Sequence, residues 1–139
     1  MIAYLDTSAL LRLVLREPGG LKELRDCEAL VSSELLAVES LRTIDRLRLQ
    51  GALSMEEAAS TRTAVDTWLE AVDLVLLQRS ILARASDPFP TPLGTLDAVH
   101  LATALVWRER MKQALVLATH DAGLALAARA FGIEVMGIG

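Results

Sequence analysis

The sequence predicts an α/β domain of three layers, with helices on both faces of a mainly parallel central sheet. Short, continuous apolar runs such as Ile2–Leu5 and Leu115–Ala118 are typical of parallel strands buried on both faces. Longer segments with helical spacing of apolar residues separate these runs, so strands and helices alternate along the chain. The 139 residues fit one domain, which we expect to cover 1–139.

The expected elements follow the order of the apolar runs and of the residues that break them. The expected strands cover 1–6, 29–31, 73–77, 114–118 and 133–136. The expected helices cover about 7–16, 21–27, 34–50, 54–70, 78–85, 96–110 and 121–130.

Capping residues and prolines set the expected boundaries. Thr7 or Ser8 can cap the first long helix, because a hydroxyl oxygen accepts a hydrogen bond from the first helical turn. Ser54 opens a capping box, which starts the helix there. The segment 87–94 holds three of the four prolines and is expected to be a loop. Thr95 can cap the helix that follows it.

Composition excludes several classes of protein. The formal net charge of −4 argues against a general polyanion binder. The single cysteine, Cys27, allows no internal disulfide and fits a reducing compartment. No apolar run approaches the ~20 residues of a membrane span, and the chain begins with a strand rather than a basic secretory leader. We therefore expect a cytoplasmic protein that does not enter a membrane.

Four carboxylates are expected to gather at one edge of the sheet: Asp6, Glu39, Asp97 and Asp121. Asp6 ends the first apolar run and Asp121 follows the fourth, so both lie outside the carboxyl ends of strands, where ligands bind in open α/β sheets. Acids held close together raise one another's pKa and destabilise a site unless a cation neutralises them. A divalent metal with oxygen ligands is the simplest explanation.

Each acid also has an ordinary structural explanation when it is considered alone. The two at strand ends can cap helices, and Asp97 in a first helical turn interacts favourably with the helix dipole. Glu39 lies among leucines in a long helix and can mark its solvated edge, where Arg42 or Arg46 can pair with it. The metal hypothesis therefore depends on all four acids together.

Two histidines lie close to these acids in the sequence. His100 follows Asp97 by one helical turn, between apolar residues, and is interpreted as support for packing rather than as a ligand. His120 precedes Asp121 and ranks behind the acids as a base or metal ligand. Ser8, His100 and Asp97 have the residue types of a catalytic triad, but no nucleophile-elbow sequence surrounds the serine. Neither zinc-ligand spacing nor a glycine-rich phosphate loop is present.

Together the motifs resemble the PIN-domain ribonucleases, and specifically the VapC-type toxins of bacterial toxin–antitoxin modules. The resemblance covers nearly the whole chain and rests on Tyr4–Leu10, the helix from Ser32 to Arg42, Leu96–Ala102 and Thr119–Asp121. It implies a PIN-like three-layer α/β/α fold. It also implies that the four acids form a metal site.

The resemblance further implies an endoribonuclease in which Mg²⁺, or Mn²⁺, activates a water that cleaves single-stranded RNA. It implies a homodimer and a small cognate antitoxin protein that inhibits the enzyme. The residues expected to contact RNA are Thr7, Ser8, Arg12, Arg16, Arg42, Arg46 and Thr119.

Two other functions are kept open. A phospho-accepting receiver domain has a similar α/β layout and also uses carboxylates around magnesium. It requires an acid pair after the first strand and a lysine after a late strand, whereas Lys22 and Lys112 lie elsewhere. The second alternative is a PIN-like module that is inactive, or that processes RNA without being a toxin. Four intact acids argue against inactivity, and a metal titration would decide.

Overall fold

A computed structural model describes residues 1–138 of the chain. Its strands form one sheet in the order β3-β2-β1-β4-β5, and every neighbouring pair is parallel. The strands are β1 (Ile2–Leu5), β2 (Ala29–Ser33), β3 (Val72–Val75), β4 (Val116–Ala118) and β5 (Glu134–Met136). The predicted parallel sheet is confirmed, and the strand ends differ from the expected ones by at most two residues.

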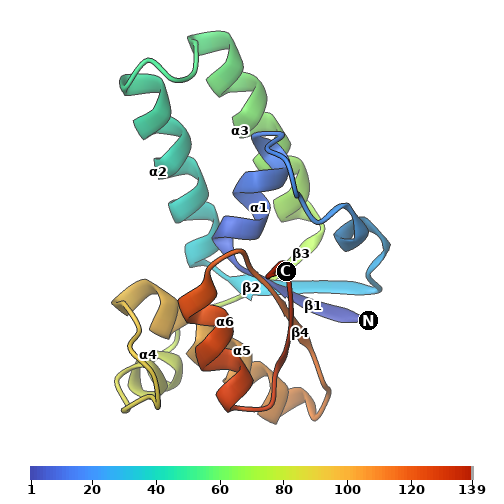
Figure 1. Cartoon of the computed structure of the whole chain (residues 1–139), viewed down its shortest axis with the longest axis vertical. Coiled ribbons are helices and arrows are strands. Elements are labelled where there is room, and N and C mark those ends of the chain that lie inside the picture. Colours follow the sequence, from blue (N-terminus) through green and yellow to red (C-terminus); the bar gives the residue numbers. More distant parts are fainter. Residues whose placement is uncertain (139) are drawn as a thin grey trace.

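Helices cover both faces of the sheet, which confirms the predicted three layers (Figure 1). The helices on one face are α1 (Thr7–Val14), α2 (Leu35–Leu49) and α3 (Met55–Glu70). The helices on the other face are α4 (Arg79–Ala85), α5 (Thr95–Met111) and α6 (Ala122–Ala130). A short 3-10 helix covers Lys22–Asp26. The α2–α3 hairpin extends well beyond the sheet (Figure 1).

Alternation along β1 divides the core into two parts. Ala3 and Leu5 pack with the apolar side chains of α1, α2 and α3. Tyr4 points to the opposite face, where it packs with Leu101 of α5 and Leu124 of α6. All three β1 side chains are fully buried. The central strand therefore anchors both helical layers, and the position of its carboxyl end is fixed from both sides.

Two of the predicted helix caps are wrong and one is confirmed. Ser54 accepts a hydrogen bond from the backbone N–H of Glu57 at 3.0 Å and completes the predicted capping box. Thr95 is instead the first residue of α5, which has Gly94 at the capping position. Neither Thr7 nor Ser8 caps α1, because both lie inside the helix and Asp6 occupies the capping position. Their hydroxyls donate to acidic side chains.

No helix within residues 1–138 is both long enough and apolar enough to cross a membrane.

Candidate active site

The candidate site lies at the point in the sheet where the strand order reverses. From the central strand β1, the chain adds β2 and β3 on one side and then β4 and β5 on the other. Asp6 directly follows β1 and Thr119 directly follows β4, and these two strands are neighbours. The carboxyl ends of strands at such a switch point form a crevice in which α/β proteins bind ligands.

Asp6 is held by two hydroxyl groups from opposite ends of the chain. Its Oδ2 atom accepts hydrogen bonds from Ser8 at 2.6 Å and from Thr119 at 2.8 Å. The side chain is almost completely buried, since Asp6 is only 4% exposed. Asp6 occupies the capping position of α1, but its side chain makes no capping hydrogen bond. The carboxylate is therefore directed into the site rather than used to start the helix.

Thr119 connects Asp6 to the next acid. The backbone N–H of Asp121 donates to the Thr119 hydroxyl oxygen at 3.0 Å. Asp121 also caps α6, because its Oδ1 atom accepts from the backbone N–H of Leu124 at 2.8 Å. The capping explanation for Asp121 is thus correct, and Oδ2 still has no hydrogen-bond partner within residues 1–138.

Glu39 reaches the site from the first half of α2. Its Oε1 atom accepts from the Thr7 hydroxyl at 2.9 Å and lies 2.6 Å from Nε2 of His100. Burial alone would raise the pKa of Glu39, but the hydrogen bond and charge interaction with His100, aided by Thr7, outweigh it and lower the pKa. Glu39 is therefore ionised at neutral pH.

His100 is buried, as the packing interpretation requires, but it is also hydrogen-bonded to the site. It is 1% exposed, and its Nδ1 atom lies 2.7 Å from the hydroxyl oxygen of Tyr4. Its Nε2 atom lies 4.0 Å from Oδ1 of Asp6. No local sequence pattern indicates the contacts of His100 with Glu39 and Tyr4, because they join residues 61 and 96 positions apart.

Asp97 lies in the first turn of α5 and is half-buried. The pKa of Asp97 is raised to about 6, mainly by burial and then by the charges of Asp121 and Asp6. The charge of His100 opposes this change in pKa, and that of Glu39 adds a smaller increase. Across residues 1–138, no Lys or Arg forms an ion pair with any of the four acids. The charges of Asp6, Asp121 and Glu39 therefore act on Asp97, and His100 is the side chain that lies near Glu39 and Asp6 as a possible counter-charge within the described residues.

A divalent metal fits the oxygen atoms that the site leaves available. Within residues 1–138, no hydrogen bond reaches Oδ1 of Asp6, Oε2 of Glu39 or either carboxylate oxygen of Asp97. Yet no three His, Cys, Asp or Glu side chains of the described chain are grouped closely enough to hold a metal ion. The expected site of four carboxylates is therefore not a single close cluster in this structure. One or two of these acids would suffice for an ion such as Mg²⁺, which keeps several waters.

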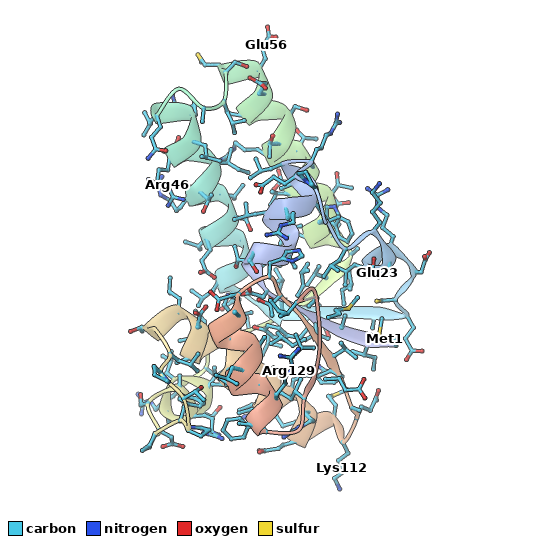
Figure 2. The ribbon with its side chains drawn as sticks, in the orientation of Figure 1. Met1, Glu23, Arg46, Glu56, Lys112 and Arg129 are labelled. Atoms are coloured by element: carbon cyan, nitrogen blue, oxygen red, sulfur yellow. The ribbon has the colours of Figure 1, made fainter. Side chains whose placement is uncertain are left out.

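The arginines expected to contact RNA fall into two groups. Arg42 pairs with Asp45 at 3.1 Å and not with Glu39, and its side chain is 71% exposed. Arg46 is also exposed and points outward from α2 (Figure 2). Arg12 and Arg16, in contrast, lie together at the other end of the α1 region.

Arg12 and Arg16 line a hollow of about 800 Å³, together with Lys22 and Arg25. We call this the basic hollow. Glu17 is the one acid among its lining residues. None of the four cations forms an ion pair within the described residues. Their charges therefore remain available to an anionic ligand.

The chain belongs to the PIN-domain family. The family model described as "PIN domain" matches residues 3–130. Ribonuclease VapC46 of Mycobacterium tuberculosis is 33% identical over 137 residues, which cover 96% of this chain and 95% of that protein. This membership excludes the receiver-type signalling domain considered from the sequence.

Two solved structures support the same fold. The crystal structure of VapBC2 from Rickettsia felis, bound to a DNA fragment from their promoter, matches with a TM-score of 0.68. The match covers 98% of both chains at 11% sequence identity. PAE2754 from Pyrobaculum aerophilum matches with a TM-score of 0.56 and 17% identity, over 97% of this chain and 89% of that one.

Proposed function

We propose that this chain is a metal-dependent endoribonuclease toxin that cleaves single-stranded RNA and is neutralised by a cognate antitoxin. The observation that carries the proposal is the placement of acids at the strand ends where the sheet order reverses, with no Lys or Arg of the described residues paired to them. The raised pKa of Asp97 agrees with this crowding of carboxylates. A crevice of this kind is suited to a divalent cation. The similarity to Ribonuclease VapC46 supports RNA as the substrate.

The proposed roles follow from the available oxygen atoms. Asp6 and Asp97 are the direct metal ligands, because each has at least one oxygen without a hydrogen bond. Glu39 and Asp121 hold water molecules or a second ion. The bound Mg²⁺ or Mn²⁺ supplies a water of lowered pKa and neutralises charge on the phosphate. Hydrolysis of the phosphodiester by water leaves 5′-phosphate and 3′-hydroxyl ends.

Thr7, Ser8 and Thr119 keep the acids in place, and we assign their predicted RNA contacts to this supporting role. Each hydroxyl donates to Asp6 or Glu39, so it is already engaged before substrate binds. For the RNA backbone, the basic hollow is a better candidate than Arg42, which Asp45 already neutralises. Guanidinium groups without an acidic partner bind phosphate oxygens well.

The proposed partners are RNA, a small antitoxin and a second copy of this chain. VapBC2 is a complex bound to promoter DNA, which supports an antitoxin partner for this chain as well. A basic antitoxin side chain placed among the four acids would neutralise them and exclude both metal and RNA. We place the homodimer in the cytoplasm, where its RNA substrates are.

The test is cleavage of a single-stranded RNA by the purified protein. We expect cleavage with Mg²⁺ or Mn²⁺ and none with excess chelator. Asp6→Asn should remain folded, because the amide oxygen still accepts hydrogen bonds, but should lose at least about 100-fold in activity. The matched control is Asp66→Asn, an exposed position on α3, which should keep full activity. Full activity in chelator would overturn the metal assignment.

A further inference from the structure

Three side chains form a continuous hydrogen-bonded row from the sheet to the site. Tyr4 of β1 lies 2.7 Å from Nδ1 of His100, and Nε2 of His100 lies 2.6 Å from Oε1 of Glu39. Tyr4 is fully buried and His100 is 1% exposed. The proposed mechanism gives neither Tyr4 nor His100 a role, although both are polar groups placed where burial is costly without a partner.

The direction of the hydrogen bonds follows from the chemistry of the two ends. Glu39 is ionised and its oxygen only accepts, so Nε2 of His100 must carry a hydrogen. At the other end, burial and the charge of Asp6 raise the pKa of Tyr4, so its hydroxyl stays protonated. In the arrangement we assign, that hydroxyl donates to Nδ1 of His100, 2.7 Å away.

The row of hydrogen bonds restricts the Glu39 side chain, which would otherwise be mobile. Glu39 extends from α2 with its side chain still 20% exposed, and three rotatable bonds precede its carboxylate. His100 and Thr7 both bind Oε1, from α5 and α1 respectively. With Oε1 fixed from two helices, Oε2 has one position, and it has no hydrogen-bond partner within residues 1–138.

We propose that Tyr4 and His100 are positioning residues, which hold Glu39 in the one orientation that serves the site. The inference rests on the proposed function in that Glu39 is taken to act on metal or water there. It differs from a packing role because it requires particular hydrogen atoms on the imidazole ring. Tyr4 selects the tautomer of His100, and the hydrogen on Nε2 of that tautomer holds the Glu39 carboxylate in place.

The central experiment compares His100→Leu with His100→Gln. Leucine fills a similar space but removes the donor, whereas the glutamine amide can still donate to Glu39. We expect His100→Leu to lose about 10- to 100-fold in kcat and in Mn²⁺ affinity, since residues that orient ligands typically have effects of that size. KM for RNA should change little, and His100→Gln should recover most of the loss.

Tyr4→Phe provides the milder variant if His100→Leu does not fold. It removes only the hydroxyl, so we expect a smaller loss in the same two quantities. Combined with His100→Leu it should add nothing, because both changes break one row. The matched control is Val99→Ala, a buried change on α5 that packs toward Ile81 and should lower stability alone.

Two readouts do not depend on RNA cleavage. The ¹⁵N chemical shifts of the His100 ring should show a hydrogen on Nε2 and none on Nδ1. Mn²⁺ affinity should be measured by calorimetry on each folded variant. If wild-type protein cleaves no RNA, the proposed function fails while these readouts still test the positioning role. A hydrogen on Nδ1, or wild-type Mn²⁺ affinity and kcat in His100→Leu and Tyr4→Phe, would overturn the inference.

Discussion

Removing the charge of Asp97 should stabilise the metal-free protein at neutral pH. Burial and the neighbouring acids raise the pKa of Asp97 from 3.8 to about 6. The folded state therefore binds this proton more tightly than the unfolded chain does. As pH rises from about 4 to about 6, ionisation of Asp97 removes stability from the folded state. Asp97→Asn cannot ionise and should escape this loss.

The magnitude follows from the size of the pKa change. A shift of about 2 units corresponds to about 3 kcal/mol at 1.36 kcal/mol per unit. Because Asp97 is only half-buried, solvent screening reduces this to about 1–2 kcal/mol. In a domain of this size, that change raises Tm by about 3–6 °C. The gain should appear at pH 7.5 and vanish near pH 4.

Thermal unfolding in chelator, at a series of pH values, measures the effect. Asp66→Asn on the exposed side of α3 is the matched control and should leave the pH profile unchanged. Saturating Mg²⁺ should reverse the order, because wild type gains binding energy that the variant, lacking one ligand, does not. A lower Tm for Asp97→Asn at pH 7.5 in chelator would show that the carboxylate is structural, and the reasoning would fail.

Three further predictions test other parts of the molecule. A Cβ atom at Gly137 would lie 2.2 Å from the carbonyl oxygen of Thr119. Gly137→Ala should therefore lower Tm clearly more than the control Gly51→Ala, because Gly51 also has a positive φ but no atom within 4 Å of the added Cβ. Equal changes in Tm would refute the clash. Arg25→Glu should weaken RNA binding and reduce the number of counterions released on binding by about one or more, as measured from the salt dependence of the affinity. The control Arg62→Glu, at a position on α3, should change neither quantity. Unchanged binding by Arg25→Glu would exclude the basic hollow as an RNA-binding surface. Expression of the chain alone should slow growth and co-expression with the antitoxin should restore it; the absence of toxicity would point to a housekeeping nuclease.

The sequence predicted the strands well because their signal is local. The central strands β1 and β4 are short apolar runs that are largely buried, and the polar residues Asp6 and Thr119 mark their carboxyl ends. From a parallel sheet it follows that these polar residues share one edge. Two of the four acids, Asp6 and Asp121, were therefore placed by rules of chain direction alone, without any knowledge of side-chain contacts.

The hydroxyl groups and His100 could not be assigned from local patterns. Thr7 and Ser8 have the residue type of helix caps, but α1 already includes both, with Asp6 at the capping position. Their hydroxyl hydrogens go to two carboxylates, and charged acceptors form strong hydrogen bonds. His100 has apolar neighbours and so reads as a core residue. Its partners are defined only by the approach of α2 to α5 and β1, which no short stretch of sequence encodes.

The pairing of β1 with β4 also determines when, during synthesis of the chain, the candidate site can form. Asp6 is among the first residues to leave a ribosome, but the Thr119 hydroxyl that holds it follows β4, late in the chain. A nascent chain that ends after α5 already has Asp6, Glu39 and Asp97, yet lacks the strand that closes the crevice and the acid beyond it. The candidate site thus cannot be completed before β4 and the residues after it have been made, so the proposed activity would arise only with the finished domain.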